Sequence, residues 1–225
     1  MLAVNGVYIA HYSLLSNRKK ILENQLLKYG ITSTWFEQEP LDHEVDILYN
    51  SNREDWESKV SLMEYIHPVP YKILNKPEIS VTYKHLKMYE RMIEENLYTC
   101  LILEDDVIFE NNFINQFNLY LYNTPRNWDM IFIGSGCDLR IDASRLKSGK
   151  TSYLKEHPAS KCADSYIIKK SSAEKILSTL KRFSFPIDFE LNYQMYLHKM
   201  NVYWWDPPIV RQGSQCGLFK SAIQQ

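Results

Sequence analysis

The apolar run at residues 100–103 (CLIL) restricts the fold more than any other feature of this sequence. It lacks the apolar–polar alternation of a strand that has one face exposed to solvent. Unbroken apolar strands are typical of sheets covered by helices on both faces. Three carboxylates, Glu104, Asp105 and Asp106, follow directly. The sequence therefore predicts a buried strand that ends in three adjacent charges.

The beginning of the chain predicts the layers around that strand. Residues 4–12 are typical of a first strand, and residues 32–38 of a second. Between them lies an amphipathic helix, with Ser16 as the expected N-cap and Gly30 able to close it in left-handed geometry. Strand–helix–strand alternation indicates a parallel α/β layer.

The rest of the chain continues this alternation, although residues 40–78 and 141–161 have weak patterns. In the helix expected at 78–97, Leu86, Tyr89, Ile93 and Leu97 share one face. Ser171 and Glu174 have the spacing of a capping box. We expect further helices at 53–66, 111–123, 171–183 and 185–200, and strands at 98–109, 128–136, 162–170 and 202–206. The prediction is one α/β domain over residues 1–225, Rossmann-type, with a mostly parallel central sheet.

Charge and cysteine content exclude several classes of protein. The 26 basic and 27 acidic residues give a net charge of −1, which argues against broad nucleic-acid binding. The four cysteines form no CxxC pair, so a Cys-based zinc site is not expected, and Cys100 and Cys137 are interpreted as small buried hydrophobes. We see no signal-peptide pattern and no apolar run of transmembrane length. The expected location is cytoplasmic, with the basic segment 141–161 as a candidate for contact with a membrane surface or an anionic acceptor.

The three carboxylates suggest a cation site. Ligands of open α/β sheets bind outside the carboxyl ends of strands. Adjacent carboxylates raise each other's pKa, and a hard divalent cation removes that repulsion. Alternation along a strand places Glu104 and Asp106 on one side and Asp105 on the other. A solvated turn remains the alternative interpretation. Receiver domains also carry paired acids, but after the first strand.

Several blocks in the same order resemble glycosyltransferase family 25, the lipopolysaccharide-type galactosyltransferases related to collagen galactosyltransferase domains. The central block, 79–109, contains an EEN turn followed by LILEDDV. Residues 8–31, CADSYIIKKSSAEKIL, FPIDFEL and PPIVRQGSQ are similar to further family landmarks. The opening departs from the pattern, because IAHY stands where family members usually have INL.

The resemblance implies a GT-A-like fold and transfer of a sugar, most simply galactose, from a UDP-sugar to a hydroxyl of a glycan or glycolipid acceptor. It implies inversion at the anomeric carbon and a Mn²⁺ or Mg²⁺ ion. Glu104 and Asp106 would be the metal-binding pair, with Glu104 on the metal or the ribose and Asp105 supporting them at the donor.

Further candidates surround this pair. Asp188 in FPIDFEL is the first choice for the general base and Glu190 the second. Asp188 is equally well placed to cap the helix that follows it. Contacts with the donor are expected from Arg18, after the first strand, from Lys84 and His85 on the helix before the acids, and from Gln212 near the diphosphate.

His11, His157 and the adjacent Trp204 and Trp205 are weaker candidates. His11 ends the first strand near the expected nucleotide, and His157 could be a third metal ligand or an acceptor contact. The two tryptophans should face opposite ways, one into the core and one toward an acceptor sugar. Two rival functions remain at this point: a non-catalytic carbohydrate-binding or adhesion relative, and a two-metal phosphohydrolase.

Overall fold

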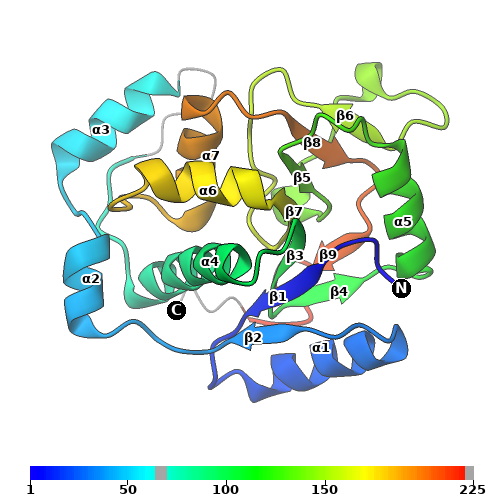
Figure 1. Cartoon of the computed structure of the whole chain (residues 1–225), viewed down its shortest axis with the longest axis horizontal. Coiled ribbons are helices and arrows are strands. Elements are labelled where there is room, and N and C mark those ends of the chain that lie inside the picture. The colour runs from blue at the N-terminus through cyan, green and yellow to red at the C-terminus, as the bar shows by residue number, and fades with distance from the viewer. Residues whose placement is uncertain (64–69, 221–225) are drawn as a thin grey trace.

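A seven-stranded sheet forms the middle layer of the computed structural model, which describes residues 1–63 and 70–220 (Figure 1). Its order is β2-β1-β3-β7-β5-β8-β6. β1 is parallel to β2 and β3, and β5 to β8, whereas β7 and β6 run antiparallel to their neighbours. The strands are β1 Gly6–Ala10, β2 Thr34–Phe36, β3 Thr99–Glu104, β5 Met130–Phe132, β6 Ser152–Leu154, β7 Ser165–Lys169 and β8 Val202–Trp205.

Helices cover both faces of this sheet. One face packs against α4 (Lys76–Glu94), α6 (Lys170–Thr179) and α7 (Ile187–Leu197), with α2 (Asp42–Leu48) and α3 (Arg53–Leu62) beyond them. The other face packs against α1 (Ser16–Lys28) and α5 (Phe113–Asn123). The predicted GT-A-like, Rossmann-type α/β architecture with a mostly parallel sheet is confirmed.

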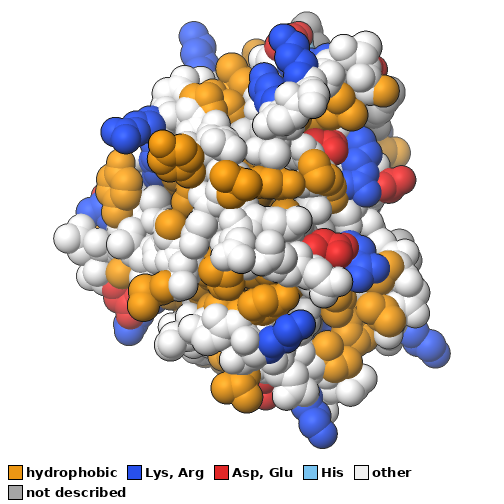
Figure 2. All heavy atoms as spheres, turned by 90° about the vertical axis from the view of Figure 1, so that its right-hand side faces the viewer, with side chains coloured by type: hydrophobic (Ala, Val, Ile, Leu, Met, Phe, Trp, Pro, Cys, Tyr) orange, Lys and Arg blue, Asp and Glu red, His pale blue; other side chains and the backbone are white. Residues whose placement is uncertain are grey.

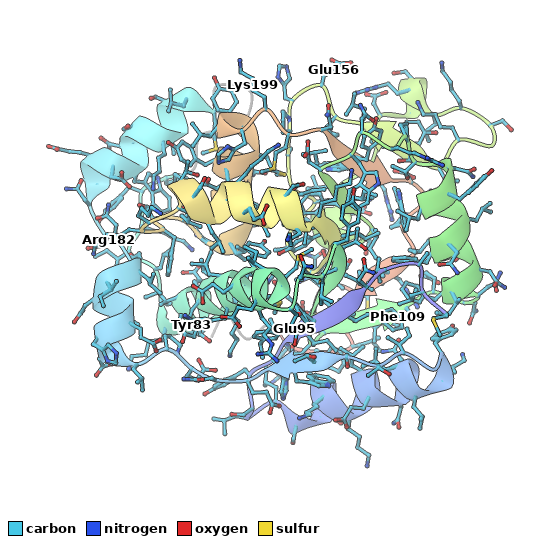
Figure 3. All side chains as sticks on the ribbon, in the orientation of Figure 1. Tyr83, Glu95, Phe109, Glu156, Arg182 and Lys199 are labelled. Carbon is cyan, nitrogen blue, oxygen red and sulfur yellow. The ribbon has the colours of Figure 1, made fainter. Side chains whose placement is uncertain are left out.

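The burial of β3 on both faces explains this three-layer arrangement. Cys100 and Ile102 belong to the core beneath α4, whereas Leu101 and Leu103 belong to the core beneath α1 and α5. All four side chains are completely buried. Side chains fill the space between the sheet and the helices on both sides (Figure 3). The apolar run therefore serves two cores at once, as predicted.

Alternation along β8 gives the same result for the two tryptophans. Trp204 packs in the core of one face and Trp205 in the core of the other, with 4% and 0% of their surfaces exposed. The Trp204 ring nitrogen donates to the carbonyl of Ala159. The prediction of opposite directions is correct, but neither ring is free to stack on an acceptor sugar.

The helix ends differ from the predictions where capping was misread. α4 begins two residues early, because Asn75 and Glu78 form a reciprocal capping box with both bonds at 3.0 Å. Ser16 is the first residue of α1 rather than its cap, and α6 starts at Lys170. In the described structure, neither helix has a side-chain hydrogen bond at its N-cap, so the predicted Ser171–Glu174 capping box is wrong. Gly30 follows α1 with φ +61°, as expected.

The segment predicted as one strand at 98–109 is two strands. β3 ends at Glu104, the chain turns at Asp105 and Asp106, and β4 (Val107–Phe109) leaves the main sheet. β4 pairs antiparallel with β9 (Val210–Gln212), a short strand that the sequence pattern did not indicate. The turn thus brings the end of the chain against the acids.

Three other segments refine the predictions. α3 ends at Leu62, and residues 64–66 of the helix expected at 53–66 lie outside the described residues. Segment 141–161 contains the 3₁₀ turn η2 (Ala143–Arg145) and β6. Cys100 is buried as expected, but Cys137 is exposed in the 3₁₀ turn η1 (Gly136–Asp138), so its assignment as a buried hydrophobe is wrong.

The surface agrees with the balanced charge of the sequence. On the face over α5, hydrophobic side chains lie in separate groups among basic and acidic ones (Figure 2). No helix in the described ranges combines the length and the apolar character needed to span a bilayer.

Candidate active site

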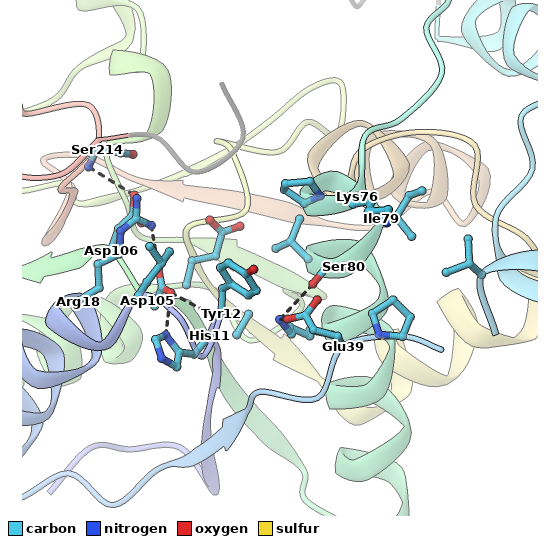
Figure 4. A pocket seen from close by; sticks show the side chains of 18 of the residues that line it. His11, Tyr12, Arg18, Glu39, Lys76, Ile79, Ser80, Asp105, Asp106 and Ser214 are labelled. Atoms are coloured by element: carbon cyan, nitrogen blue, oxygen red, sulfur yellow. Dashed lines mark hydrogen bonds and ion pairs between the residues drawn. The ribbon is translucent and has the colours of Figure 1, made fainter. Parts of the chain in front are cut away.

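A cavity of about 790 Å³ opens at the carboxyl ends of β1 and β3 (Figure 4). β1 and β3 are neighbours in the sheet. The chain goes from β1 to β2 on one side of this pair, and from β3 it goes on to β5 on the other side. Such a switch point is where open α/β sheets bind ligands. The lining comes from the ends of β1 and β3, the segment after β2, the N-terminal half of α4 and the segment after β9, and includes His11, Arg18, Glu39, Lys84, Glu104, Asp105, Asp106, Gln212 and Ser214.

Asp105 is held by charged and polar groups from the beginning of the chain. Its carboxylate accepts a hydrogen bond from Arg18 Nη1 at 2.9 Å and lies 2.8 Å from His11 Nδ1. The backbone N–H of Tyr12 donates to the same carboxylate. Arg18 shares the buried stripe of α1 with Leu22 and Leu26, so the helix itself directs the guanidinium to the edge of the sheet. Asp105 therefore joins β1, α1 and β3, and its predicted supporting role at the donor stays a prediction.

Within residues 1–63 and 70–220, Glu104 and Asp106 have no comparable positive partner. Oδ2 of Asp106 accepts the backbone N–H of Ser214 at 3.3 Å, but Oδ1 is buried and lacks a hydrogen-bond partner among the described residues. Burial raises the pKa of Asp106. Burial, and then repulsion from Asp106, raise the pKa of Glu104 well above its usual range. Both carboxylates thus lie in a site that disfavours their charge.

Asp164 is a third member of this group that sequence reasoning missed. It precedes β7, and its backbone carbonyl accepts the N–H of Glu104 at 2.9 Å. Burial and the proximity of Asp106 raise the pKa of Asp164 to about 7. Its Oδ1 is another buried oxygen for which the described structure offers no partner. The sequence shows only an aspartate just before an apolar strand, and the antiparallel pairing of β3 with β7 that brings it to the acids has no local signal.

His85 lies behind Glu104 rather than in the cavity. Its ring is completely buried, and Nδ1 is 2.7 Å from the hydroxyl of Tyr166, which also bonds the hydroxyl of Tyr89. Nε2 is 3.7 Å from Glu104 Oε1. Burial lowers the pKa of His85 to about 3, so the ring is neutral at physiological pH. The expected direct contact between His85 and a donor is therefore wrong, because the buried ring lies behind Glu104.

Lys84 lines the cavity, although its ammonium already has partners. Its ammonium pairs with Glu39 and donates to Ser80 Oγ at 3.0 Å. Only 3% of the residue is exposed, so α4 holds this charge in place. Lys84 is thus a fixed cation on the wall opposite the acids.

The segment after β9 forms the wall of the cavity next to Asp106. The backbone N–H of Gly213 donates to the Asp106 carbonyl at 2.7 Å. Arg18 donates to the carbonyl of Lys220, and its guanidinium lies over the ring of Phe219, 5.4 Å from the centroid. Gln212 also lines the cavity, and its Oε1 is buried without a partner in the described ranges.

The two candidate bases have different surroundings. Asp188 is half-buried in the first turn of α7, and its carboxylate accepts the N–H of Phe189. Burial raises its pKa, and its charge contributes to the raised pKa of Glu104. Glu190 is 1% exposed and accepts the backbone N–H groups of Ser184 and Phe185. Glu190 therefore holds the loop before α7, and its assignment as a second base is wrong.

The donor set partly fits a hard divalent cation. Glu104 and Asp106 supply carboxylate oxygens, and the partnerless Oδ1 of Asp106 has unused capacity for a ligand. Within the described residues, no three His, Cys, Asp or Glu side chains are arranged to hold a metal. His157 is exposed beyond β6 and is not among the residues lining the described cavity. Two carboxylates supply only part of the coordination shell of a divalent cation, and Mg²⁺ commonly takes its remaining ligands from water and phosphate oxygens.

Comparison with known proteins identifies the class. The sequence profile of glycosyltransferase family 25, described as an LPS biosynthesis protein family, matches residues 7–191. This chain therefore belongs to glycosyltransferase family 25. It is a transferase of the nucleotide-sugar type. None of the curated protein sequences matches the chain.

Three solved structures are distantly similar to this chain. A glycosyltransferase involved in glycosylation of the major capsid of PBCV-1 has 10% identity, a TM-score of 0.48 and 92% coverage of both chains. Protein A197 from STIV has 11% identity and a TM-score of 0.40, with 91% of this chain and 81% of that chain covered. The inositol-1-phosphate CTP transferase from T. maritima has 11% identity, a TM-score of 0.37 and coverage of 92% and 68%.

Proposed function

We propose that this chain transfers a hexosyl group, most simply galactose, from a UDP-sugar to a hydroxyl of a glycan or glycolipid acceptor, with inversion and with a Mn²⁺ or Mg²⁺ ion. The observation that carries the proposal is the partnerless, buried Oδ1 of Asp106 beside Glu104, at the edge of a cavity lined by fixed cations. A site that raises the pKa of two carboxylates in this way favours a ligand that brings positive charge.

The donor would lie between the acids and the basic side chains. A bound cation would neutralise the charge that develops on the departing nucleoside diphosphate. Glu104 and Asp106 would hold that cation. Lys84 and Arg18 line the same cavity and would contact the phosphates or the ribose. Because both cations are already fixed by carboxylates, little side-chain entropy would be lost on binding.

Asp188 is the proposed general base. Catalytic bases work best when their pKa lies near the working pH, and burial moves the pKa of Asp188 upward in that direction. Its bond to the N–H of Phe189 fixes the carboxylate at the start of α7 and leaves a second oxygen for an acceptor hydroxyl. The charge of Asp188 also raises the pKa of Glu104. The base that activates the acceptor would therefore interact electrostatically with the acids that stabilise the leaving group.

Calorimetric titration tests the proposal. UDP-galactose and UDP-glucose are titrated, with and without Mn²⁺, into the wild type, Asp106→Ala and the control Glu57→Ala. Glu57 is an exposed carboxylate on α3, paired with Arg53. We expect Mn²⁺-dependent binding by the wild type and the control, and at least a tenfold weaker affinity in Asp106→Ala.

The ratio of the two donor affinities then identifies the preferred sugar. If the folded wild type binds neither nucleotide sugar, the proposal fails. A non-catalytic carbohydrate-binding relative then becomes the better description.

A further inference from the structure

We propose that Cys137 and Cys162 form a redox-active dithiol next to the acidic site, which closes reversibly to an intramolecular disulfide by exchange with a small-molecule disulfide. Both cysteines are free thiols in this structure. The inference concerns thiol chemistry and does not depend on the transferase function.

The two sulfur atoms are already in contact. Cys137 lies in η1 after β5, Cys162 lies in the loop before β7, and their Sγ atoms are 2.9 Å apart. A disulfide bond is about 2.05 Å long, so a further approach of about 0.9 Å suffices to form one. Thiols separated by 25 residues are brought together by the fold and not by local sequence.

Tight packing of the two loops keeps the sulfurs close. A Cβ at Gly136 would be 2.5 Å from Cys162 Cβ and 2.6 Å from the carbonyl oxygen of Lys161. The turn can approach the loop this closely because Gly136 has no side chain. The short distance between the sulfurs is therefore built into the backbone.

Cys137 has the properties of the attacking thiol. It is exposed, whereas Cys162 is partly buried. Cys162 Sγ donates a hydrogen bond to it, and Gln215 Nε2 is 3.5 Å from the same sulfur. These two contacts lower the pKa of Cys137 to about 6. The thiolate is the nucleophile in disulfide exchange, and Cys137 supplies one at neutral pH.

The exchange proceeds in two balanced steps. The Cys137 thiolate attacks one sulfur of the small disulfide, whose S–S bond breaks and releases one thiolate. The Cys162 thiol then loses its proton to solvent and attacks the Cys137 sulfur, which releases the second small thiolate. Two protein thiols are oxidised while one small disulfide is reduced to two thiols. An excess of small thiol reverses both steps.

The pair is next to two walls of the acidic site. Cys162 is two residues before Asp164, and the backbone N–H of Cys137 donates to Gln215 Oε1 at 2.6 Å. Gln215 follows Ser214, which contacts Asp106. A disulfide would therefore fix the loop that carries Asp164 against η1, to which the segment after β9 is bonded.

Thiol counting in glutathione buffers tests the proposal. The reduced protein is equilibrated at increasing ratios of oxidised to reduced glutathione and quenched with an alkylating agent in denaturant, which also exposes the buried Cys100. Intact mass and peptide mapping then count the free thiols. We expect the wild type to lose two of its four alkylatable thiols through a Cys137–Cys162 linkage, and to recover them in dithiothreitol.

Cys216→Ser is the matched control, because Cys216 is also exposed but its thiol donates to a backbone carbonyl, that of Gly213. This variant should form the same linkage at the same glutathione ratio. Cys137→Ser and Cys162→Ser, checked for folding by circular dichroism, should each carry a glutathione adduct or a free thiol instead. Four alkylated thiols at every ratio, or a linkage that involves Cys216, would overturn the proposal, and the wild-type map alone decides this if a variant fails to fold.

Discussion

Asp105 and Asp106 are neighbours in sequence, yet the structure balances their charges in opposite ways. Asp105 is surrounded by Arg18, His11 and a backbone N–H from the beginning of the chain. Asp106 receives one backbone N–H from Ser214 and keeps a buried oxygen that no described residue satisfies. A compensated charge stabilises the fold, whereas an uncompensated one costs stability until a ligand arrives. The same motif therefore contains one compensated carboxylate and one uncompensated carboxylate, and the proposed function assigns the second to a ligand.

The largest effect should come from removing the compensated charge. Asp105→Ala leaves the buried Arg18 without its carboxylate partner, and breaking a buried ion pair costs about 3–5 kcal/mol. Asp106→Ala loses one weak hydrogen bond and relieves repulsion, so its cost should be below about 1 kcal/mol. Urea unfolding of both variants in metal-free buffer measures this difference. Equal losses in the two variants would contradict the comparison.

The next effect is a pH dependence of stability that comes from Asp164, another buried carboxylate beside Asp106. Asp164 has a usual pKa of 3.8 and a folded pKa of about 7, so the folded state binds the proton more tightly than the unfolded state. Its contribution is fully present below pH 4 and is lost as pH rises through about 7.

Over that window, metal-free protein should lose on the order of 4 kcal/mol of unfolding free energy from this group. Asp164→Asn, which cannot ionise, should flatten the curve. Urea midpoints at several pH values check this, and parallel curves for the two proteins would refute it.

A cation should reverse part of that loss. At tenfold its dissociation constant, Mn²⁺ bound only by the folded state adds about 1.4 kcal/mol of stability. Thermal unfolding of the wild type at pH 8 should therefore shift upward with Mn²⁺, and Glu104→Gln should show little or no shift. The variant should itself be slightly more stable than the wild type without metal, because a neutral amide removes repulsion from Asp106. A full shift in Glu104→Gln would exclude this residue as a ligand.

The smallest effect concerns the polar network under Glu104. Tyr166→Phe removes the hydroxyl bonded to His85 and Tyr89, at a cost of about 1 kcal/mol. If His85 supports Glu104 only by position, the affinity for the donor should fall less than threefold. Denaturation and donor titration measured on the same sample separate the two effects. A larger loss of affinity than of stability would assign the network a direct part in binding.

The sequence was sufficient for the parts of the molecule that depend on local pattern. The unbroken apolar run of β3 predicted helices on both faces, and alternation predicted that Asp105 would differ from its neighbours. The capping of α4 was missed because Asn75 and Glu78 lie outside its apolar periodicity. Asp164, Ser214 and the Cys137–Cys162 contact could not be predicted, because each depends on pairing between distant strands. Ser214 reaches Asp106 across 108 residues, and nothing local to either residue signals the other.

The position of Asp106 also has a consequence for synthesis of the protein. Glu104 and Asp106 are translated near the middle of the sequence, whereas Gly213 and Ser214, which hold Asp106, come about a hundred residues later. Domains begin to fold while the chain is still emerging from the ribosome. A nascent chain can therefore assemble β1, α1 and the Asp105 ion pairs well before the other wall of the cavity exists. The protein would pass through a period in which its scaffold is formed but its acids stay open to solvent and to free cations.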